Sequence, residues 1–329
     1  MTHRSIQYRE ALKEALMEEM ARDENVFIMG EDVGRYGGVY QISSGVHAAF
    51  GTKRAVDTPI AELGFTSIAV GAALAGLRPV IEIMYIDFST LAIDPIVNQA
   101  AKARYMFGGK AKVPIVVRTQ GGAGRGNAAQ HSQNLEAWYA HVPGLVVVQP
   151  ATPYDAKGLL KSAIRSDNPV IFIENKLLYN TKGHVPEEEY TIPIGKADIK
   201  RNGSDVTLVA TSRMVLFTLE AAERLTQEGI DAEVIDLRTL KPMDIDTITQ
   251  SVQKTHHLVV INEGVRTCGY AAEVVARSYE SFFDELDGPI IRVTTNDVVI
   301  PYSGTLELAA MPSVEKIVTA AQESMGLLA

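Results

Sequence analysis

The sequence predicts an α/β protein with two domains, each built around a mainly parallel sheet. Short apolar runs rich in β-branched residues recur along the 329-residue chain, and segments of helix length separate them. The runs are apolar throughout, which is typical of parallel strands that helices cover on both faces. A stretch rich in charge, Pro and Gly near residues 180–200 separates two groups of runs. We therefore expect one domain over residues 1–185, a linker over 186–200 and a second domain over 201–329.

The apolar runs are the expected strands of the two sheets. In the first domain they begin at Val26, Arg78, Val113, Leu145 and Pro169. In the second domain they begin at Asp205, Ala232, His257 and Pro289. The segments between them are long enough for the crossover helices that parallel strands require.

One of these crossover helices has a clear start signal. Thr152 precedes Pro153, and Thr is a favoured N-cap while Pro suits the first helical position. Beyond them, Leu159, Leu160 and Ile164 recur at helical spacing. We expect these three side chains to form the buried stripe of the helix.

The N-terminal segment SIQYREALKEALMEEMARD is also predicted to be an amphipathic helix, with Leu12, Leu16 and Met20 on one face. Acidic residues run through it, so it resembles neither a signal peptide nor a transit peptide. Cys268 is the single cysteine, which excludes an intrachain disulfide framework and fits a reducing compartment. We expect a cytoplasmic location.

Charge and hydropathy exclude several classes of partner. The chain has 40 Asp and Glu against 31 Lys and Arg, a formal net charge of −9, and no long basic run. No nucleic-acid surface is therefore expected. The apolar run Phe65–Leu77 is too short to span a bilayer and is followed directly by Arg78, so no membrane segment is expected either.

The segment Asp57–Arg78 places one carboxylate, Glu62, at the head of a helix that is otherwise uncharged and rich in small residues. Thr58 and Pro59 are the expected N-cap and first turn. Little side-chain bulk follows, so another helix could approach closely and desolvate Glu62, which would suit it to proton chemistry. The alternative is an ordinary first-turn acid favoured by the helix dipole.

A glycine-rich segment, Arg118–Gln133, follows an expected strand, as active-site loops do in open α/β sheets. It contains His131 between hydrogen-bonding neighbours, and a lone His of this kind is either catalytic or simply structural. G-x-G-x-x-G would need glycine at Asn127, which disfavours a nicotinamide-dependent reductase. The histidines lack zinc-ligand spacing. The glycines that would allow a close backbone approach to a ligand are Gly121, Gly122, Gly124 and Gly126.

Several motifs in order resemble the β subunit of the E1 component of 2-oxo acid dehydrogenase complexes, the pyruvate, branched-chain and acetoin group. The motifs are GEDVGRYGGVY, DTPIAELGF, AVGAALAGLRP, NQAAKARYMFGGK, AAQHSQ, PGLVVVQPATPYDAKGLLKSAIRSDNPV and VIDLRTLKPMD. With PY-x-G-T-L-E from Pro301, they cover essentially the whole chain. The resemblance implies a doubly wound domain of the thiamine-diphosphate pyrimidine-binding type and a second α/β domain like the C-terminal domain of transketolase.

The resemblance also implies roles for particular residues. Glu62 matches the acid beside N1′ of the cofactor's aminopyrimidine, and Ile60, Met84 and Phe88 match positions that bind or line the pyrimidine. His131 matches the histidine that assists chemistry at the substrate or lipoyl group.

A potassium ion in the family is bound by carbonyls that match Ile115, Ala163, Ile164 and Asn168. This chain departs from the pattern at Ser166, where the family has Asp.

The resemblance further implies a shared active site. The GDG motif that holds Mg²⁺ and diphosphate in thiamine-diphosphate enzymes does not occur in this sequence, so an α chain is expected to supply Mg²⁺ ligands in an α2β2 heterotetramer. The implied function is oxidative decarboxylation of a 2-oxo acid, with pyruvate as the first expectation, and acyl transfer to a lipoyl-bearing E2 chain. Acetoin and branched-chain 2-oxo acids remain alternative substrates. A non-catalytic scaffold subunit is the alternative of another class.

Overall fold

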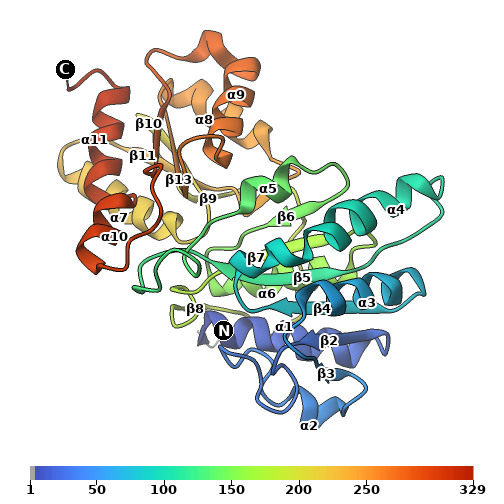
Figure 1. Cartoon of the computed structure of the whole chain (residues 1–329). Helices are drawn as coiled ribbons and strands as arrows, with labels where there is room; N and C mark the ends of the chain where they lie inside the picture. The colour runs from blue at the N-terminus through green and yellow to red at the C-terminus, as the bar shows by residue number, and fades with distance from the viewer. Residues whose placement is uncertain (1–3, 329) are drawn as a thin grey trace. The chain divides into compact units, whose positions relative to one another are not determined.

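The computed structural model describes residues 4–328, and the chain divides into two compact units (Figure 1). The first unit contains the residues up to Gly121 and Trp138–Ile194, and the second contains Gly122–Ala137 and the residues from Gly195 onward. The glycine-rich loop that carries His131 therefore belongs to the second unit. Within residues 4–328, no helix is both long and apolar enough to cross a bilayer.

The first unit is built on a parallel sheet with the strand order β6-β7-β5-β4-β2-β3. Its strands are β2 (Val26–Gly30), β3 (Ala55–Asp57), β4 (Arg78–Ile83), β5 (Val116–Gly121), β6 (Val146–Val148) and β7 (Val170–Asn175). Each of the five apolar runs expected in this part of the chain contains one of these strands. The sequence analysis did not predict β3, which has only three residues and lies at the edge of this set.

The order of these strands creates a switch point at β2. From β2 the chain goes to β3 on one side and then returns to β4 on the other side, and Gly30 at the end of β2 pairs with both Asp57 and Glu82. In open parallel sheets, ligands bind in the crevice outside the carboxyl ends of the strands at such a point. The side chains that follow β2 and β4 are therefore the first place to look for a site.

Helices and a short strand pair complete the first unit. The helical segments are α1 (Tyr8–Arg22), α2 (Val46–Phe50), α3 (Glu62–Leu74), η1 (Ile86–Ala92), η2 (Pro95–Ala100), α4 (Ala101–Met106), α5 (Glu136–His141), whose first two residues belong to the second unit, and α6 (Pro153–Arg165). An antiparallel pair is formed by β1 (Ser5–Gln7) and β8 (Lys182–His184). Thr152 caps α6 as expected, because its hydroxyl accepts a hydrogen bond from the Asp155 amide at 3.2 Å.

The predicted start of the helix that bears Glu62 is wrong. Instead of opening the helix, Thr58 donates its backbone N–H to Gly30 at 3.0 Å and so continues the pairing of β3 with β2. The helix α3 begins at Glu62, and Ala61 is its N-cap. Strand pairing outweighs the local capping preference, and as a result Glu62 occupies the first helical position, where the helix dipole favours negative charge.

The second unit is built on a five-stranded sheet with the order β14-β13-β10-β11-β9. The strands are β9 (Asp198–Arg201), β10 (Val206–Ala210), β11 (Ala232–Asp236), β13 (Leu258–Val265) and β14 (Ile291–Thr295), with β12 (Thr239–Lys241) outside this sheet. All neighbours are parallel except β9, an antiparallel edge strand. The four apolar runs expected in this part of the chain are all strands. The edge strand β9 was not predicted from the sequence.

Helices pack on this sheet in pairs (Figure 1). They are α7 (Met214–Gln227), α8 (Ile245–Thr255), α9 (Tyr270–Phe282), η3 (Phe283–Glu285), α10 (Gly304–Ala310) and α11 (Val314–Ser324). α7 packs with α11, and α8 packs with α9. The short α10 bears the sequence motif that begins at Pro301.

A buried ion network crosses the centre of the first sheet. Arg118 on β5 is 1% exposed and forms a bidentate pair with Glu174 on β7, at 2.7 and 2.9 Å. Its remaining nitrogen donates to Glu82 on β4 at 2.7 Å, and Tyr179 donates to Glu174 at 2.7 Å. Burial alone would lower the pKa of Arg118, but Glu174 and Glu82 outweigh burial and raise it. One guanidinium thus compensates two buried carboxylates.

We predict that Arg118→Met destabilises the chain by about 3–5 kcal/mol, because it leaves Glu82 and Glu174 buried without a cation. Urea unfolding of the full chain measures the change. Arg224→Met is the matched control, since Arg224 pairs with Glu220 and Glu315 at the surface and should change stability little. Equal unfolding free energies for Arg118→Met and the wild type would contradict the network's role.

Candidate active site

Three buried carboxyl groups gather at the carboxyl ends of β2 and β4. Glu31 follows β2 and is 5% exposed, Glu62 opens α3 and is 5% exposed, and Glu82 lies in β4 at 8%. Burial raises the pKa of Glu31 from its ordinary value of 4.5 to about 7, and the charges of Glu62, Asp32 and Glu82 raise it further in the same direction. Since Arg118 binds Glu82, Glu31 is the member of this cluster suited to hold a proton near neutral pH.

The segment after β2 is held by Asp57 at the end of β3, and its Gly38 lies beside the Glu82 carboxylate. The Asp57 carboxylate accepts hydrogen bonds from the amides of Gly34 at 2.5 Å and Arg35 at 3.3 Å. A side chain at Gly34 would have its Cβ 2.7 Å from that carboxylate, so only glycine fits there. The GEDVG sequence therefore encodes both a buried acid, Glu31, and the turn at Gly34 that Asp57 holds.

The predicted pyrimidine-lining residues lie in the same region. Met84 and Phe88 follow β4 directly and are partly exposed, and the Phe88 ring packs edge-on against Tyr85 with 6.0 Å between ring centroids. Gln120 on β5 donates its side-chain amide to the Met84 carbonyl. Ile60 precedes α3 and is 82% exposed. Glu62, Met84, Phe88 and Ile60 thus all belong to the first unit.

Buried polar atoms without a hydrogen-bond partner also mark this end of the sheet. In the part of the chain that the structure describes, these atoms include Oε1 of Glu31, Oγ1 of Thr58, Oγ1 of Thr119 and Oε1 of Gln120. Such atoms are rare in folded proteins because each costs about 1–3 kcal/mol. Their concentration at the ends of β2, β3 and β5 fits a site that completes its hydrogen bonds with a polar heterocycle.

His131 lies in the second unit, on a loop that we name the His131 loop (residues 122–133). Its ring is partly exposed, and Ser132 beside it is 1% exposed with no partner for its hydroxyl among residues 4–328. The loop is closed at its base because the Gly122 amide donates to the Gln133 carbonyl at 3.2 Å. A closed loop of this kind keeps His131 in a defined place relative to the second unit.

Another buried acid lies just after the His131 loop. Burial raises the pKa of Glu136 to about 7; a hydrogen bond from Asn262 opposes the shift and the charge of Glu263 adds to it. Neither Glu136 nor Glu263 was predicted from the sequence to have a role. The single sequence signal for Glu263 is its position at the polar end of an apolar strand, LVVINEG.

The carbonyls predicted to bind potassium lie around the C-terminal end of α6. Each has a donor within the first unit. Arg78 Nε donates to Ile164 at 2.9 Å, while the carbonyls of Ile115, Ala163 and Asn168 accept hydrogen bonds at 2.9, 3.2 and 3.3 Å. All four are hard oxygen donors, and those of Ala163 and Ile164 lie in the last turn of α6, at the negative end of its dipole, so the donor type fits a monovalent cation.

Positive side chains already occupy much of this carbonyl cluster. Arg78 also donates to the Ser166 carbonyl at 2.6 Å and pairs with Asp167 at 3.2 Å, and Lys112 pairs with the other Asp167 oxygen at 2.8 Å. The Lys112 hydrogen bond is the largest of the causes that lower the pKa of Asp167. A bound potassium ion would therefore share the cluster with Arg78.

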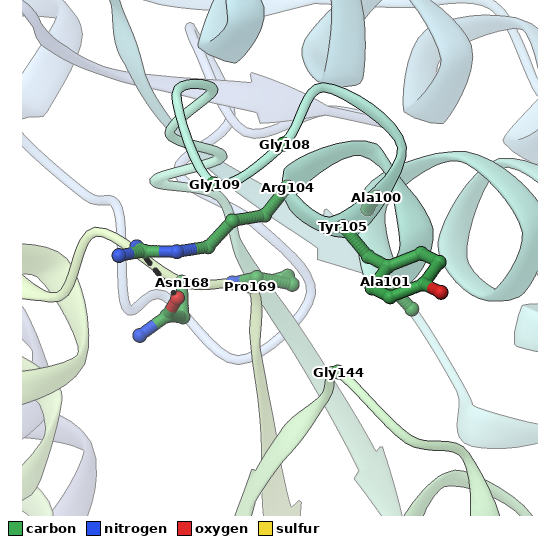
Figure 2. A pocket seen from close by; sticks show the side chains of 9 residues that line it. All are labelled: Ala100, Ala101, Arg104, Tyr105, Gly108, Gly109, Gly144, Asn168 and Pro169. Carbon is green, nitrogen blue, oxygen red and sulfur yellow. Dashed lines mark hydrogen bonds between the residues drawn. The ribbon is translucent and has the colours of Figure 1, made fainter.

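A pocket of about 530 Å³ lies beside this cluster (Figure 2). Its walls come from the end of η2, from α4 and the turn after it, and from the loops that precede β6 and β7. Arg104 donates to the Asn168 side chain across it at 3.2 Å. Glu62, Met84 and Phe88 do not line it. Within residues 4–328, no group of three His, Cys, Asp or Glu side chains is arranged to hold a metal ion.

Comparisons with known proteins agree with the fold of both units. Residues 4–182 match the pyrimidine-binding domain family of transketolase, and residues 195–317 match the transketolase C-terminal domain family. A solved structure described as "Split gene transketolase, inactive beta4 tetramer" superimposes with a TM-score of 0.79 at 24% identity, covering 98% of this chain and 99% of that one. This likeness shows the fold.

Curated relatives extend over nearly the whole chain. Mitochondrial pyruvate dehydrogenase E1 component subunit beta of Caenorhabditis elegans is 53% identical over 97% of this chain and 92% of its own length. The Bos taurus protein of the same name is 51% identical over 97% and 90%. The beta-1 subunit of Arabidopsis thaliana is 50% identical over 96% and 88%.

The cytoplasmic location expected from the sequence is wrong. The relatives from these three organisms are mitochondrial proteins by name, which contradicts the cytoplasmic expectation. The physical reason for the error is that a lone Cys268 reports only on a reducing environment, and more than one compartment provides it.

We predict that, as the pH rises from about 4.5 to 7, the free energy of unfolding falls less in Glu31→Gln than in the wild type. The folded state raises the pKa of Glu31 to about 7, so folding favours its neutral form; this contribution is present at low pH and is lost as the pH rises through 7. Urea unfolding at pH 5 and pH 8 measures the difference. Glu24→Gln, at an exposed site, is the control, and identical pH dependence in Glu31→Gln and wild type would show that Glu31 titrates normally.

Proposed function

Because the chain belongs to the family of pyruvate dehydrogenase E1 component β subunits, we propose that it supplies the pyrimidine-binding half of a thiamine-diphosphate active site. It is an E1 β subunit of the 2-oxo acid dehydrogenase type, and the reaction is oxidative decarboxylation of a 2-oxo acid, with pyruvate as the substrate. The observation that carries the proposal is the cluster of Glu31, Glu62 and Glu82 at the switch point of the parallel sheet.

The residues at this end of the sheet fit the pyrimidine end of thiamine diphosphate. The fit rests on buried carboxyl groups able to exchange a proton, on half-buried Met84 and Phe88, and on the unpaired polar atoms of Thr119 and Gln120. Thiamine diphosphate, when bound, supplies the electron sink that lets a 2-oxo acid lose carbon dioxide. The protein contributes orientation and proton transfer.

Glu62 is proposed to hold a proton at N1′ of the aminopyrimidine. It occupies the first position of α3, in the low-dielectric surroundings that strengthen such a hydrogen bond. Glu31 is buried near it with a pKa of about 7, so Glu31 can take up or release a proton at neutral pH beside Glu62. Met84, Phe88 and exposed Ile60 are proposed to contact the ring and exclude water.

His131 is proposed to donate a proton or hydrogen bond to the substrate or to the lipoyl group during acyl transfer. Its partly exposed ring on a closed loop supports this role. A scaffold subunit without catalytic function would need neither His131 nor a buried acid pair. A catalytic subunit is therefore favoured over a scaffold subunit.

An α chain is the proposed partner, in an α2β2 assembly, and it would provide Mg²⁺ and the diphosphate contacts. The sequence lacks the GDG motif that does this in other enzymes of the class. A lipoyl-bearing E2 chain is the proposed acyl acceptor, and the acidic balance of this chain, −9, suits a basic docking domain. Assay of the purified α and β pair with pyruvate, branched 2-oxo acids and acetoin, read by an artificial electron acceptor, tests the substrate.

Potassium is proposed as a structural ion of the first unit. The oxygen donors at the C-terminal end of α6 support it, and such an ion would fix the loop between α6 and β7. A higher melting temperature of the chain in potassium than in choline chloride at equal ionic strength would support the site.

We predict that Glu62→Gln lowers turnover roughly 10²–10⁴-fold with α–β assembly preserved, because the amide cannot exchange a proton with N1′. If Glu62 were only a helix-dipole acid, the change would cost at most about 1 kcal/mol of stability and leave turnover intact. The hydrogen–deuterium exchange rate at C2 of the bound cofactor decides between the two. Glu24→Gln serves as control, and a wild-type rate in Glu62→Gln would remove Glu62 from the mechanism.

We also predict that the chain by itself does not bind thiamine diphosphate tightly, since it offers the pyrimidine end of the site without the diphosphate ligands. Calorimetric titration with thiamine diphosphate and Mg²⁺ measures this for the chain alone and for the chain with its α partner. Micromolar affinity of the isolated chain would contradict the half-site proposal.

A further inference from the structure

The His131 loop lies against two buried carboxylates of its own unit. Glu307 on α10 is 2% exposed, and its two oxygens accept hydrogen bonds from the amides of Gly124 at 2.7 Å and Gly126 at 3.0 Å. The Glu263 carboxylate accepts the Ala123 amide at 2.8 Å. Three of the four backbone amides at residues 123–126, those of 123, 124 and 126, are therefore bound by side-chain carboxylates.

The backbone conformation explains why glycines occupy these places. Gly124 and Gly126 have φ values of 99° and 65°, in the left-handed region that other residues enter at a cost. This geometry lets two amides separated by one residue converge on a single carboxylate, as in backbone nests that bind anions. The sequence predicted that the glycines serve close approach to a ligand; at Gly124 and Gly126 the group that they approach is Glu307.

Further contacts fasten the rest of the loop. Ala123 is 1% exposed and packs with Ile300 and Met311, and its carbonyl accepts a hydrogen bond from Arg213 at 3.3 Å. At the far end of the loop, Asn134 donates its side-chain amide to the Glu263 carbonyl at 3.3 Å.

Glu263 thus binds the segment on both sides of His131, through its carboxylate before it and through its backbone carbonyl after it.

We propose that Glu307 is the positioning residue of His131, and that Glu263 supports it. Glu307 carries a negative charge that its two amide partners compensate, and charge-assisted hydrogen bonds of this kind are about twice as strong as neutral ones. The His131 loop, between β5 and α5, contains no helix or strand. The two carboxylates therefore replace the hydrogen bonds that a helix or strand would provide. The position of His131 is therefore set by a loop that the side chains of Glu307 and Glu263 hold. The inference rests on the proposed function of His131, whereas the hydrogen bonds themselves do not.

The first test is hydrogen exchange of the full chain, which requires neither cofactor nor partner. In the wild type, the amides of Gly124 and Gly126 should be protected although they lie outside helices and strands. In Glu307→Gln, one of the two acceptor oxygens becomes an amide NH2 group, which donates and cannot accept, so both backbone amides should exchange at least roughly tenfold faster. Trypsin should also cleave after exposed Arg125 more quickly. Glu307→Asp keeps the charge but shortens the reach and should have the same effect, while exposed Glu315→Gln is the control.

The second test asks whether Glu307 acts through His131. In the assembled α–β enzyme, Glu307→Gln should lower turnover about 10²-fold, the size of effect that a displaced catalytic group produces. In a His131→Ala background the same substitution should cost almost nothing further, because residues that act as a unit are non-additive.

Additive losses, or unprotected Gly124 and Gly126 amides in the wild type, would overturn the proposal. If wild-type enzyme turned over no 2-oxo acid while the exchange results held, the proposed function would fail and the loop assignment would stand.

Discussion

The guanidinium of Arg118 sets the charge balance at the carboxyl end of the first sheet. It lies on β5 between Glu82 and Glu174, and its five donors match two carboxylates in fixed geometry. A buried acid without a cation tends to keep its proton, and Glu31 shows this by its pKa of about 7. The network therefore divides the acids of this region: Glu82 and Glu174 are bound by Arg118, whereas Glu31 has no such cation partner within residues 4–328 and its pKa is raised.

This arrangement follows from the order of the strands as much as from the residues. Because β2 lies between β3 and β4, the side chains that follow β2 and β4 share one crevice, and strand pairing at Thr58 delays the start of α3 until Glu62. A start at Pro59 would put Glu62 almost a full turn into the helix, away from the free amides of its first turn. The helix start thus depends on tertiary pairing that no local capping rule contains.

The sequence predicted the strands of both sheets where runs were long and wholly apolar, as in VFIMG, RPVIEI and PVIFIE. It missed β3 and β9, which are short and carry charged residues, because edge strands bury only part of their surface and leave no apolar run. Glu62 was identified from its isolation among small residues and from the family resemblance. Glu31 and Glu82 were not, since their roles come from neighbours brought together by strands that are distant in sequence.

The two sets of buried acids differ in how they act. Glu31 lies among carboxylates that raise its pKa, so its charge depends on pH and on whatever polar ring completes the unpaired atoms around it. Glu263 and Glu307 accept hydrogen bonds from backbone amides of the His131 loop, so they act by holding backbone in place rather than by transferring a proton. A carboxylate bound by backbone amides holds a segment in place, whereas a carboxylate beside other carboxylates can take up or release a proton. In the second unit, carboxylates bound by amides hold the His131 loop. In the first unit, carboxyl groups close to one another serve the proposed proton transfer.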